Sequence, residues 1–149
     1  MRDTLSSWES YARSVLRIIL AFTFSLHGFR HLFGAFRVSG GRRGAVPMAL
    51  DGLPEMFGGL ELVGGLLLLL GLLTRPVAAI LCLELLAGYF YSAVPHGVWP
   101  IRNGGNEVLL YLLAFVYFAV AGGGVWSLDE MIAGRKSAPE ISSVRAVRI

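Results

Sequence analysis

The stretch Leu26-His27-Gly28-Phe29-Arg30-His31-Leu32-Phe33-Gly34 sets three ionisable side chains into an otherwise apolar segment. His27 and His31 are four positions apart, so in a helix they share one face, and Arg30 lies beside them. A charged side chain alone at the centre of a bilayer costs about 2.5 to 3.5 kcal/mol on insertion scales. If this segment crosses a membrane, its polar side chains must find partners on other helices.

The composition predicts an integral membrane protein. Of the 149 residues, 55% are hydrophobic and 15% are charged, whereas soluble domains have about 45 to 50% and about 25%. The net charge of +3 could suggest nucleic acid, but the basic residues gather at the ends of apolar runs and form no stripe with aromatic residues. We therefore expect a lipid bilayer, and no nucleic acid, as a partner.

Four apolar segments predict an all-α fold, an integral membrane four-helix bundle. Each has the roughly 18 residues or more that cross a hydrocarbon core about 30 Å thick. Only Thr74 and Arg75 precede Pro76, which suits the first turn of a helix, so the second and third helices are expected to form an antiparallel hairpin. The four segments lie at residues 15–36, 54–73, 76–95 and 105–126.

The distribution of Lys and Arg predicts that both termini are cytoplasmic. Residues 1–14 carry both signs of charge and lead into no small-x-small cleavage pattern, so we expect the first apolar segment to be retained. One transmembrane domain is expected at residues 1–130 and a polar cytoplasmic tail at residues 131–149. The inner side would hold Arg2, Arg13, Arg75, Arg135, Lys136, Arg145 and Arg148, and the outer side Arg37, Arg42, Arg43 and Arg102.

This topology brings ionisable residues from all four helices into the outer half of the membrane. We expect Arg30 and Glu61 to pair there, because they lie at similar depth on neighbouring helices. Gly58, Gly64 and Gly65 surround Glu61 at helical spacing, and small residues let another helix approach closely. The candidates for ligand binding or proton relay are His27, Arg30, His31, Glu61, Glu84, Tyr91, Glu107 and Tyr111, with Tyr91 and Tyr111 facing one chamber.

Two interpretations of this cluster stay open, a network that fixes helix register and a chamber for a small molecule, a quinone or a proton. Neither a metal nor a haem is expected. His27, His31 and Glu61 have no further ligand at a metal-binding spacing. A haem with two histidine ligands would need His96, which lies too close to the membrane surface. The sequence contains no motif that identifies a catalytic residue, so whether the protein is an enzyme also stays open.

Several motifs resemble those of the DoxX family of small membrane proteins, over roughly residues 17–130. The first helix has His-Gly followed by Leu-Phe-Gly, and the second has Glu-x-x-Gly-Gly closing on Gly-x-x-Thr-Arg. The fourth begins near Asn-Gly-Gly-Asn-Glu and ends in Gly-Gly-Gly before Ser-Leu-Asp. Where family members commonly place Lys, this chain has His31, so either Arg30 takes the role of the cation or the site titrates near neutral pH. The motifs occupy residues 27–34, 61–75, 103–107 and 122–129.

The resemblance implies a multi-pass four-helix bundle in a bacterial cytoplasmic (inner) membrane. The family takes its name from subunits associated with quinol oxidase and thiosulfate:quinone oxidoreductase, although most members lack an assigned activity. It therefore implies an accessory subunit of a quinone-linked redox system, with a quinone as the cofactor to test and other membrane or redox subunits as partners. A non-catalytic anchor or assembly protein, a small transporter-like bundle, and a homo-oligomer are alternatives.

Overall fold

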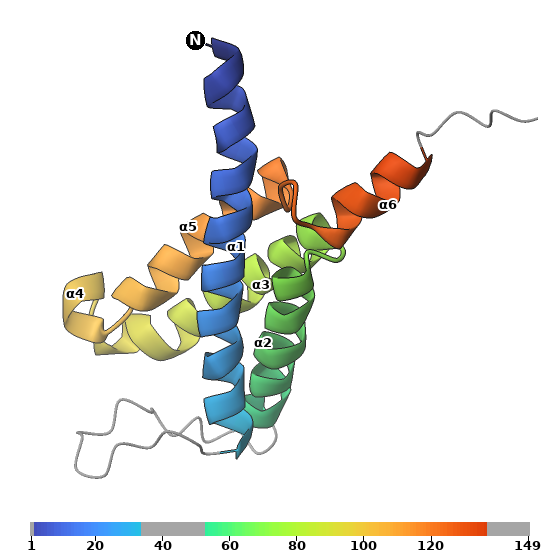
Figure 1. Cartoon of the computed structure of the whole chain (residues 1–149). Helices are drawn as coiled ribbons and strands as arrows, with labels where there is room; N and C mark the ends of the chain where they lie inside the picture. Colours follow the sequence, from blue (N-terminus) through green and yellow to red (C-terminus); the bar gives the residue numbers. More distant parts are fainter. Residues whose placement is uncertain (1, 34–52, 137–149) are drawn as a thin grey trace, which may run out of the picture.

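The computed structural model describes residues 2–33 and 53–136, and within these ranges the chain is helical and contains no strand (Figure 1). The predicted all-α class is confirmed. The α-helices of the described chain are α1 (Arg2–Phe33), α2 (Leu53–Leu70), α3 (Thr74–Gly88), α4 (Pro100–Asn103), α5 (Asn106–Ala121) and α6 (Leu128–Lys136).

The four long helices are arranged as two pairs. The most extensive packing is between α1 and α2, and the next is between α3 and α5. The pairs meet mainly through α2 and α3, and α1 touches α5 at few points. Figure 1 shows the α3–α5 pair crossing the α1–α2 pair obliquely, with α6 extending away beside the α2–α3 turn.

Buried aromatic and aliphatic side chains from all four long helices fill the space between the pairs. Phe24 of α1 meets Phe115 of α5 edge to face, with ring centroids 4.8 Å apart. Leu68 of α2 and Leu81 of α3 complete this centre, and all four side chains are almost fully buried. The burial of these apolar groups holds the two pairs in one unit.

Glycines bring the backbones of α1 and α2 into direct contact. A Cβ atom at Gly28 would collide with the backbone of Leu62, and one at Gly65 would collide with Ser25. The small-residue groove expected around Glu61 is therefore present, but it is divided between two neighbours. Gly65 faces α1, whereas a Cβ atom at Gly64 would press on Leu81 of α3.

The path of α3 changes its winding before it ends. A π-helical turn at Tyr89–Ala93 and a 3₁₀ turn at Val94–His96 continue it. The hydroxyl of Ser92 donates a hydrogen bond to the Gly88 carbonyl at 2.6 Å. Because a π turn inserts an extra residue, it rotates the faces of the helix on either side of it.

Several predicted boundaries differ from the structure for local reasons. The first helix begins at Arg2, since its polar residues before 15 form a helix that hydropathy does not detect. The second ends at Leu70, because Gly71 and Leu73 have φ of +69° and +51°. The fourth ends at Ala121, and Gly122 takes φ of +80°. The predicted residues 34–36, the first loop and most of the tail lie outside the described residues.

Within the described residues, two helical segments are long and apolar enough to cross a membrane, Trp8–Phe33 and Thr74–His96. The apolar parts of the other two long helices are shorter, at Met56–Leu70 and Asn106–Ala121.

Candidate functional site

The structure brings most of the predicted site residues into one polar cluster. On one side, Nε2 of His27 lies 3.6 Å from Oε1 of Glu107. On the other, Nε2 of His31 lies 4.0 Å from Oε2 of Glu61. We define the polar cluster as His27 and His31 of α1, Glu61 of α2, Glu84 of α3, and Glu107 and Tyr111 of α5.

Two carboxylates form the buried part of the polar cluster. Glu84 is only 8% exposed, the side chain of Glu61 is 13% exposed, and the two are close enough for their charges to interact. Both carboxylate oxygens of Glu84 and Oε2 of Glu61 are buried and have no hydrogen-bond partner among the described residues. Buried polar atoms are almost always paired. These oxygens are therefore available to accept a hydrogen bond or to bind a proton.

The expected pairing of Arg30 with Glu61 is wrong. Arg30 is exposed, no ion pair within 4.0 Å joins it to Glu61 in the part of the chain that the structure describes, and its charge acts on Glu61 only at longer range. One helical position is about 100° of rotation, which turns His31 towards Glu61 and Arg30 away.

Tyr111 and Tyr91 differ in position. The Tyr111 ring packs against Phe24 and lies edge to face with His27, at centroid distances of 5.2 and 6.0 Å. Tyr91 is 54% exposed, and no ring contact or hydrogen bond to the polar cluster is found for it in the described chain. It lies in the π-helical turn, whose extra residue breaks the i, i+3, i+4 spacing that placed it beside Glu84.

Beside the His27–Glu107 pair lies a small pocket of about 190 Å³, lined by Leu20, Leu110, Tyr111 and Glu107. His96 is exposed at the end of the α3 path, and its Nδ1 lies 2.9 Å from the Ser92 carbonyl oxygen. Among the described residues, no group of His, Cys, Asp or Glu is arranged to hold a metal ion.

A second polar centre, which the sequence reasoning missed, is built on Arg17 at the opposite end of the long helices. Arg17 is fully buried, and every hydrogen bond of its guanidinium within the described chain is donated to a backbone carbonyl. It reaches Leu69 at 2.8 Å, Gly123 and Trp126 at 2.9 Å each, and also Leu68. The last carbonyls of α2 have no partners within the helix, so Arg17 caps α2 and ties it to the segment before α6.

Asp129 caps α3 from the first turn of α6. Its two carboxylate oxygens accept hydrogen bonds from the amides of Leu73 and Thr74, at 2.7 and 2.8 Å. Burial alone would raise the pKa of Asp129, but the bonds from Thr74 and Leu73 and the charge of Arg17 outweigh it and hold the pKa below its usual value.

Two of the glycine motifs meet at this centre, the one that ends at Thr74-Arg75 and the one that begins at Gly122. A Cβ atom at Gly71 would collide with Ser127 and crowd the Arg17 guanidinium. One at Gly124 would collide with Ser14, whose hydroxyl accepts a hydrogen bond from the Trp126 amide at 3.1 Å. The sequence did contain a signal for this centre, the charge of Arg17 inside an apolar segment. The carbonyls that Arg17 binds lie within or beside two of the glycine motifs.

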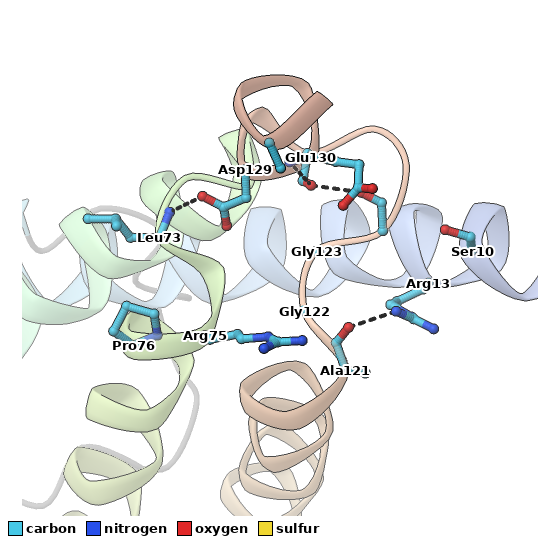
Figure 2. Close-up of a pocket in the computed structure, with 13 residues that line it drawn as sticks. Ser10, Arg13, Leu73, Arg75, Pro76, Ala121, Gly122, Gly123, Asp129 and Glu130 are labelled. Carbon is cyan, nitrogen blue, oxygen red and sulfur yellow. Dashed lines mark hydrogen bonds between the residues drawn. The ribbon is translucent and has the colours of Figure 1, made fainter. Parts of the chain in front are cut away.

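An open cleft of about 470 Å³ lies beside this centre. Its walls include Ser10 and Arg13 of α1, Arg75 at the start of α3, the Gly122 turn, and Glu130 of α6 (Figure 2). Arg13 donates to the Ala121 carbonyl at 2.7 Å and to Glu9 at 2.7 Å.

Comparison with known proteins agrees with these motifs. The sequence model of the DoxX family matches residues 12–92, more than half of the chain. An uncharacterized protein of Haemophilus influenzae is 41% identical over 134 residues, covering 86% of this chain and 96% of the relative. An uncharacterized membrane protein of Mycobacterium tuberculosis is 26% identical over 135 residues, covering 83% and 82%. No solved structure matches the chain. The expected resemblance is confirmed, and this chain belongs to the DoxX family of membrane proteins.

Proposed function

We propose that this DoxX-family protein is an accessory subunit of a quinone-linked redox system, and that its polar cluster holds the quinone head group. The observation that carries the proposal is the pair of buried carboxylates, Glu61 and Glu84, with three oxygens that lack partners in the described chain. A network that served only to fix helix register would gain most by satisfying its own members. Unpaired acceptors in an apolar surrounding favour a chamber for a ligand or a proton.

The residues present fit the head group of a quinone. The carboxylates of Glu84 and Glu61 can accept hydrogen bonds from hydroxyl groups, and an imidazole N–H of His31 can donate one to a carbonyl oxygen. Phe24 and Tyr111 supply flat apolar surface next to these groups. A bound quinone would supply redox chemistry in which electrons and protons move together.

The exposure of the side chains in the polar cluster decreases from His31 through Glu61 to Glu84. The side chain of His31 is 42% exposed, that of Glu61 is 13% exposed, and Glu84 is 8% exposed. This order favours His31 as the group that exchanges protons with the surface and Glu84 as the innermost acceptor. Neighbouring Arg30 and His27 on α1, and Glu107 and Tyr111 on α5, are the other ionisable groups around this path.

We further propose that all four long helices cross the cytoplasmic (inner) membrane and that both termini face the cytoplasm. Two hydrogen bonds support this topology, that of Arg13 to the Ala121 carbonyl and that of the Leu73 amide to Asp129. They bring the first part of α1, the start of α3 and the end of α5 to one side. The pair of His27 and Glu107 brings the start of α5 to the other end of α1.

Binding of short-chain quinol analogues, the reduced form whose hydroxyl groups can donate hydrogen bonds to Glu84, to the purified protein in anaerobic nanodiscs tests the head-group proposal. We expect a rise in the unfolding temperature that Glu84→Gln largely abolishes, because an amide replaces one acceptor oxygen by a donor. Glu130→Gln is the matched control, since this exposed glutamate of α6 lies outside the polar cluster and its change should leave the effect intact.

Two results would contradict the proposal. One is the absence of any thermal shift with ubiquinol and menaquinol analogues, together with no quinone in the lipid extract of the purified protein. The other is a shift that Glu84→Gln and Glu130→Gln reduce equally. Either result would favour a non-catalytic anchor or assembly protein.

A further inference from the structure

The open cleft beside the Arg17 centre has a different chemistry from the polar cluster. It is formed where α1, the start of α3 and the Gly122 turn come together, and Arg75 and Arg13 approach this turn from opposite sides (Figure 2). None of the residues assigned to the proposed quinone site lines it.

Most of the charged groups around this cleft are already engaged. Arg13 is bound to Glu9 and to the Ala121 carbonyl, and Asp129 accepts the amides of Leu73 and Thr74.

Arg75 is the exception among the cations. It is exposed, and no hydrogen bond or ion pair to its guanidinium is found in the described residues. The positive charge on this wall of the cleft is therefore available to a ligand. Of the two carboxylates that line the cleft, Asp129 is engaged, whereas no hydrogen bond or ion pair of the Glu130 side chain is found within the described chain.

Aromatic side chains indicate at which level of the membrane the cleft lies. Tyr11 and Trp126 meet edge to face with ring centroids 5.7 Å apart, and Trp8 and Trp126 are both well exposed. Tryptophan and tyrosine concentrate at the level of lipid head groups. The amide of Trp126 is bonded to Ser14, next to Arg13, so Arg13 lies near that level, and Arg75 lines the same cleft. Leu73 and Pro76, both exposed on the cleft wall, offer apolar contacts.

We propose that this cleft binds the phosphate group of an anionic phospholipid, with Arg75 as the main ligand and Arg13 as a second positive charge. A guanidinium can give two parallel hydrogen bonds to phosphate oxygens. The lipid phosphodiester carries a single negative charge, whereas a phosphate monoester or free phosphate carries about −1.5 to −2 at neutral pH. The nearby carboxylate of Glu130 repels the more highly charged form more strongly and so favours the lipid. The proposal is independent of the quinone site.

Native mass spectrometry of the delipidated protein in detergent tests it. We expect phosphatidylglycerol to bind more tightly than phosphatidylcholine, and Arg75→Gln to weaken phosphatidylglycerol binding about tenfold, as expected for one charge-assisted contact. Arg102→Gln is the matched control, because this exposed arginine lies in α4 near the opposite end. Glu130→Gln should strengthen binding several-fold, which loss of folding cannot imitate.

Several results would contradict the proposal. Equal affinity for the two lipids, or equal losses in the Arg75 and Arg102 variants, would show that the cleft does not select an anionic phospholipid. Displacement of bound phosphatidylglycerol by low millimolar inorganic phosphate would assign the cleft to free phosphate instead. Circular dichroism of every variant keeps altered helix content apart from altered binding, and an Arg75→Lys variant that binds no better than Arg75→Gln would exclude a charge effect.

Discussion

At the scale of single residues, two kinds of buried charge are handled in opposite ways. Arg17 has its guanidinium hydrogens directed at backbone carbonyls of two segments, the end of α2 and the segment before α6. Glu84 is almost as buried, yet neither of its oxygens has a partner in the described residues. A satisfied buried charge stabilises a particular arrangement of helices, whereas an unsatisfied one costs free energy unless something binds to it. The first pattern is expected of a residue that stabilises the fold, and the second of a residue in a functional site.

Arg17→Met is expected to lower the free energy of unfolding by about 3 kcal/mol, because it leaves several buried carbonyls without donors. Arg17→Lys should recover part of this loss, since an ammonium group has fewer donors. Thermal unfolding in detergent measures the difference, and Arg102→Met should change stability by no more than about 0.5 kcal/mol. Unfolding temperatures that are the same for Arg17→Met and Arg102→Met would show that the carbonyl bonds contribute little.

Asp129 predicts a dependence of stability on pH. The folded-state pKa lies below the ordinary value of 3.8, so the ionised carboxylate stabilises the fold at and above that pH, and the contribution is lost as the pH falls through the lower folded value. Asp129→Asn should cost about 1 kcal/mol at neutral pH, as for loss of a helix cap. The difference from the unmodified protein should shrink in acid.

The matching measurement is a series of thermal melts from neutral to strongly acidic pH, with the exposed neighbour Glu130→Gln as control. A stability difference for Asp129→Asn that stays constant down to the lowest pH would mean that the charge of Asp129 does not cap α3.

At the scale of helices, close backbone approach determines how α1 and α2 pack. Gly65 and Gly59 lie on the same helix but meet different surroundings. A Cβ atom at Gly65 would collide with the Ser25 side chain and lie 3.0 Å from its backbone nitrogen, whereas nothing lies within 4 Å of one at Gly59. The two positions therefore offer a matched pair of substitutions.

Gly65→Ala is expected to destabilise the protein by about 1 to 3 kcal/mol, because α1 must move away from α2. Gly59→Ala should be neutral or stabilise by up to about 1 kcal/mol, since alanine favours helix. Thermal melts of the two variants under one set of conditions compare them. Equal destabilisation would mean that contact between the backbones is not what holds this pair.

The helices themselves were predictable because apolar runs of this length have few other structures open to them. Their ends were less so. The stop of α2 depends on Leu73, a residue that rarely takes positive φ, which is held there by the distant Asp129. Hydropathy also missed α6, where the sequence is mixed in polarity. Short-range patterns cannot detect structure that is imposed by a partner more than fifty residues away.

At the scale of the whole molecule, the two ends of the helices differ. One end is closed by Arg17, Asp129 and the glycine turns, and the other holds the polar cluster with its unpaired carboxylates. The sequence predicted that the ionisable groups converge, since charges in a membrane must find partners, but it chose Arg30 where the structure places His31 against Glu61. The helical rotation that decides between adjacent residues is set by the packing of Gly28 against α2, which only the assembled pair reveals.

The capping of α2 by Arg17 also has a consequence for biosynthesis. Arg17 is made early, but Gly123 and Trp126, which supply two of its acceptors, are made about a hundred residues later. During translation the nascent α1 therefore carries a cation whose final partners do not yet exist. In the proposed topology, the translocon or lipid phosphates would have to shelter that charge while α1 inserts, and the Arg17 centre is complete only when Gly123 and Trp126 have been made.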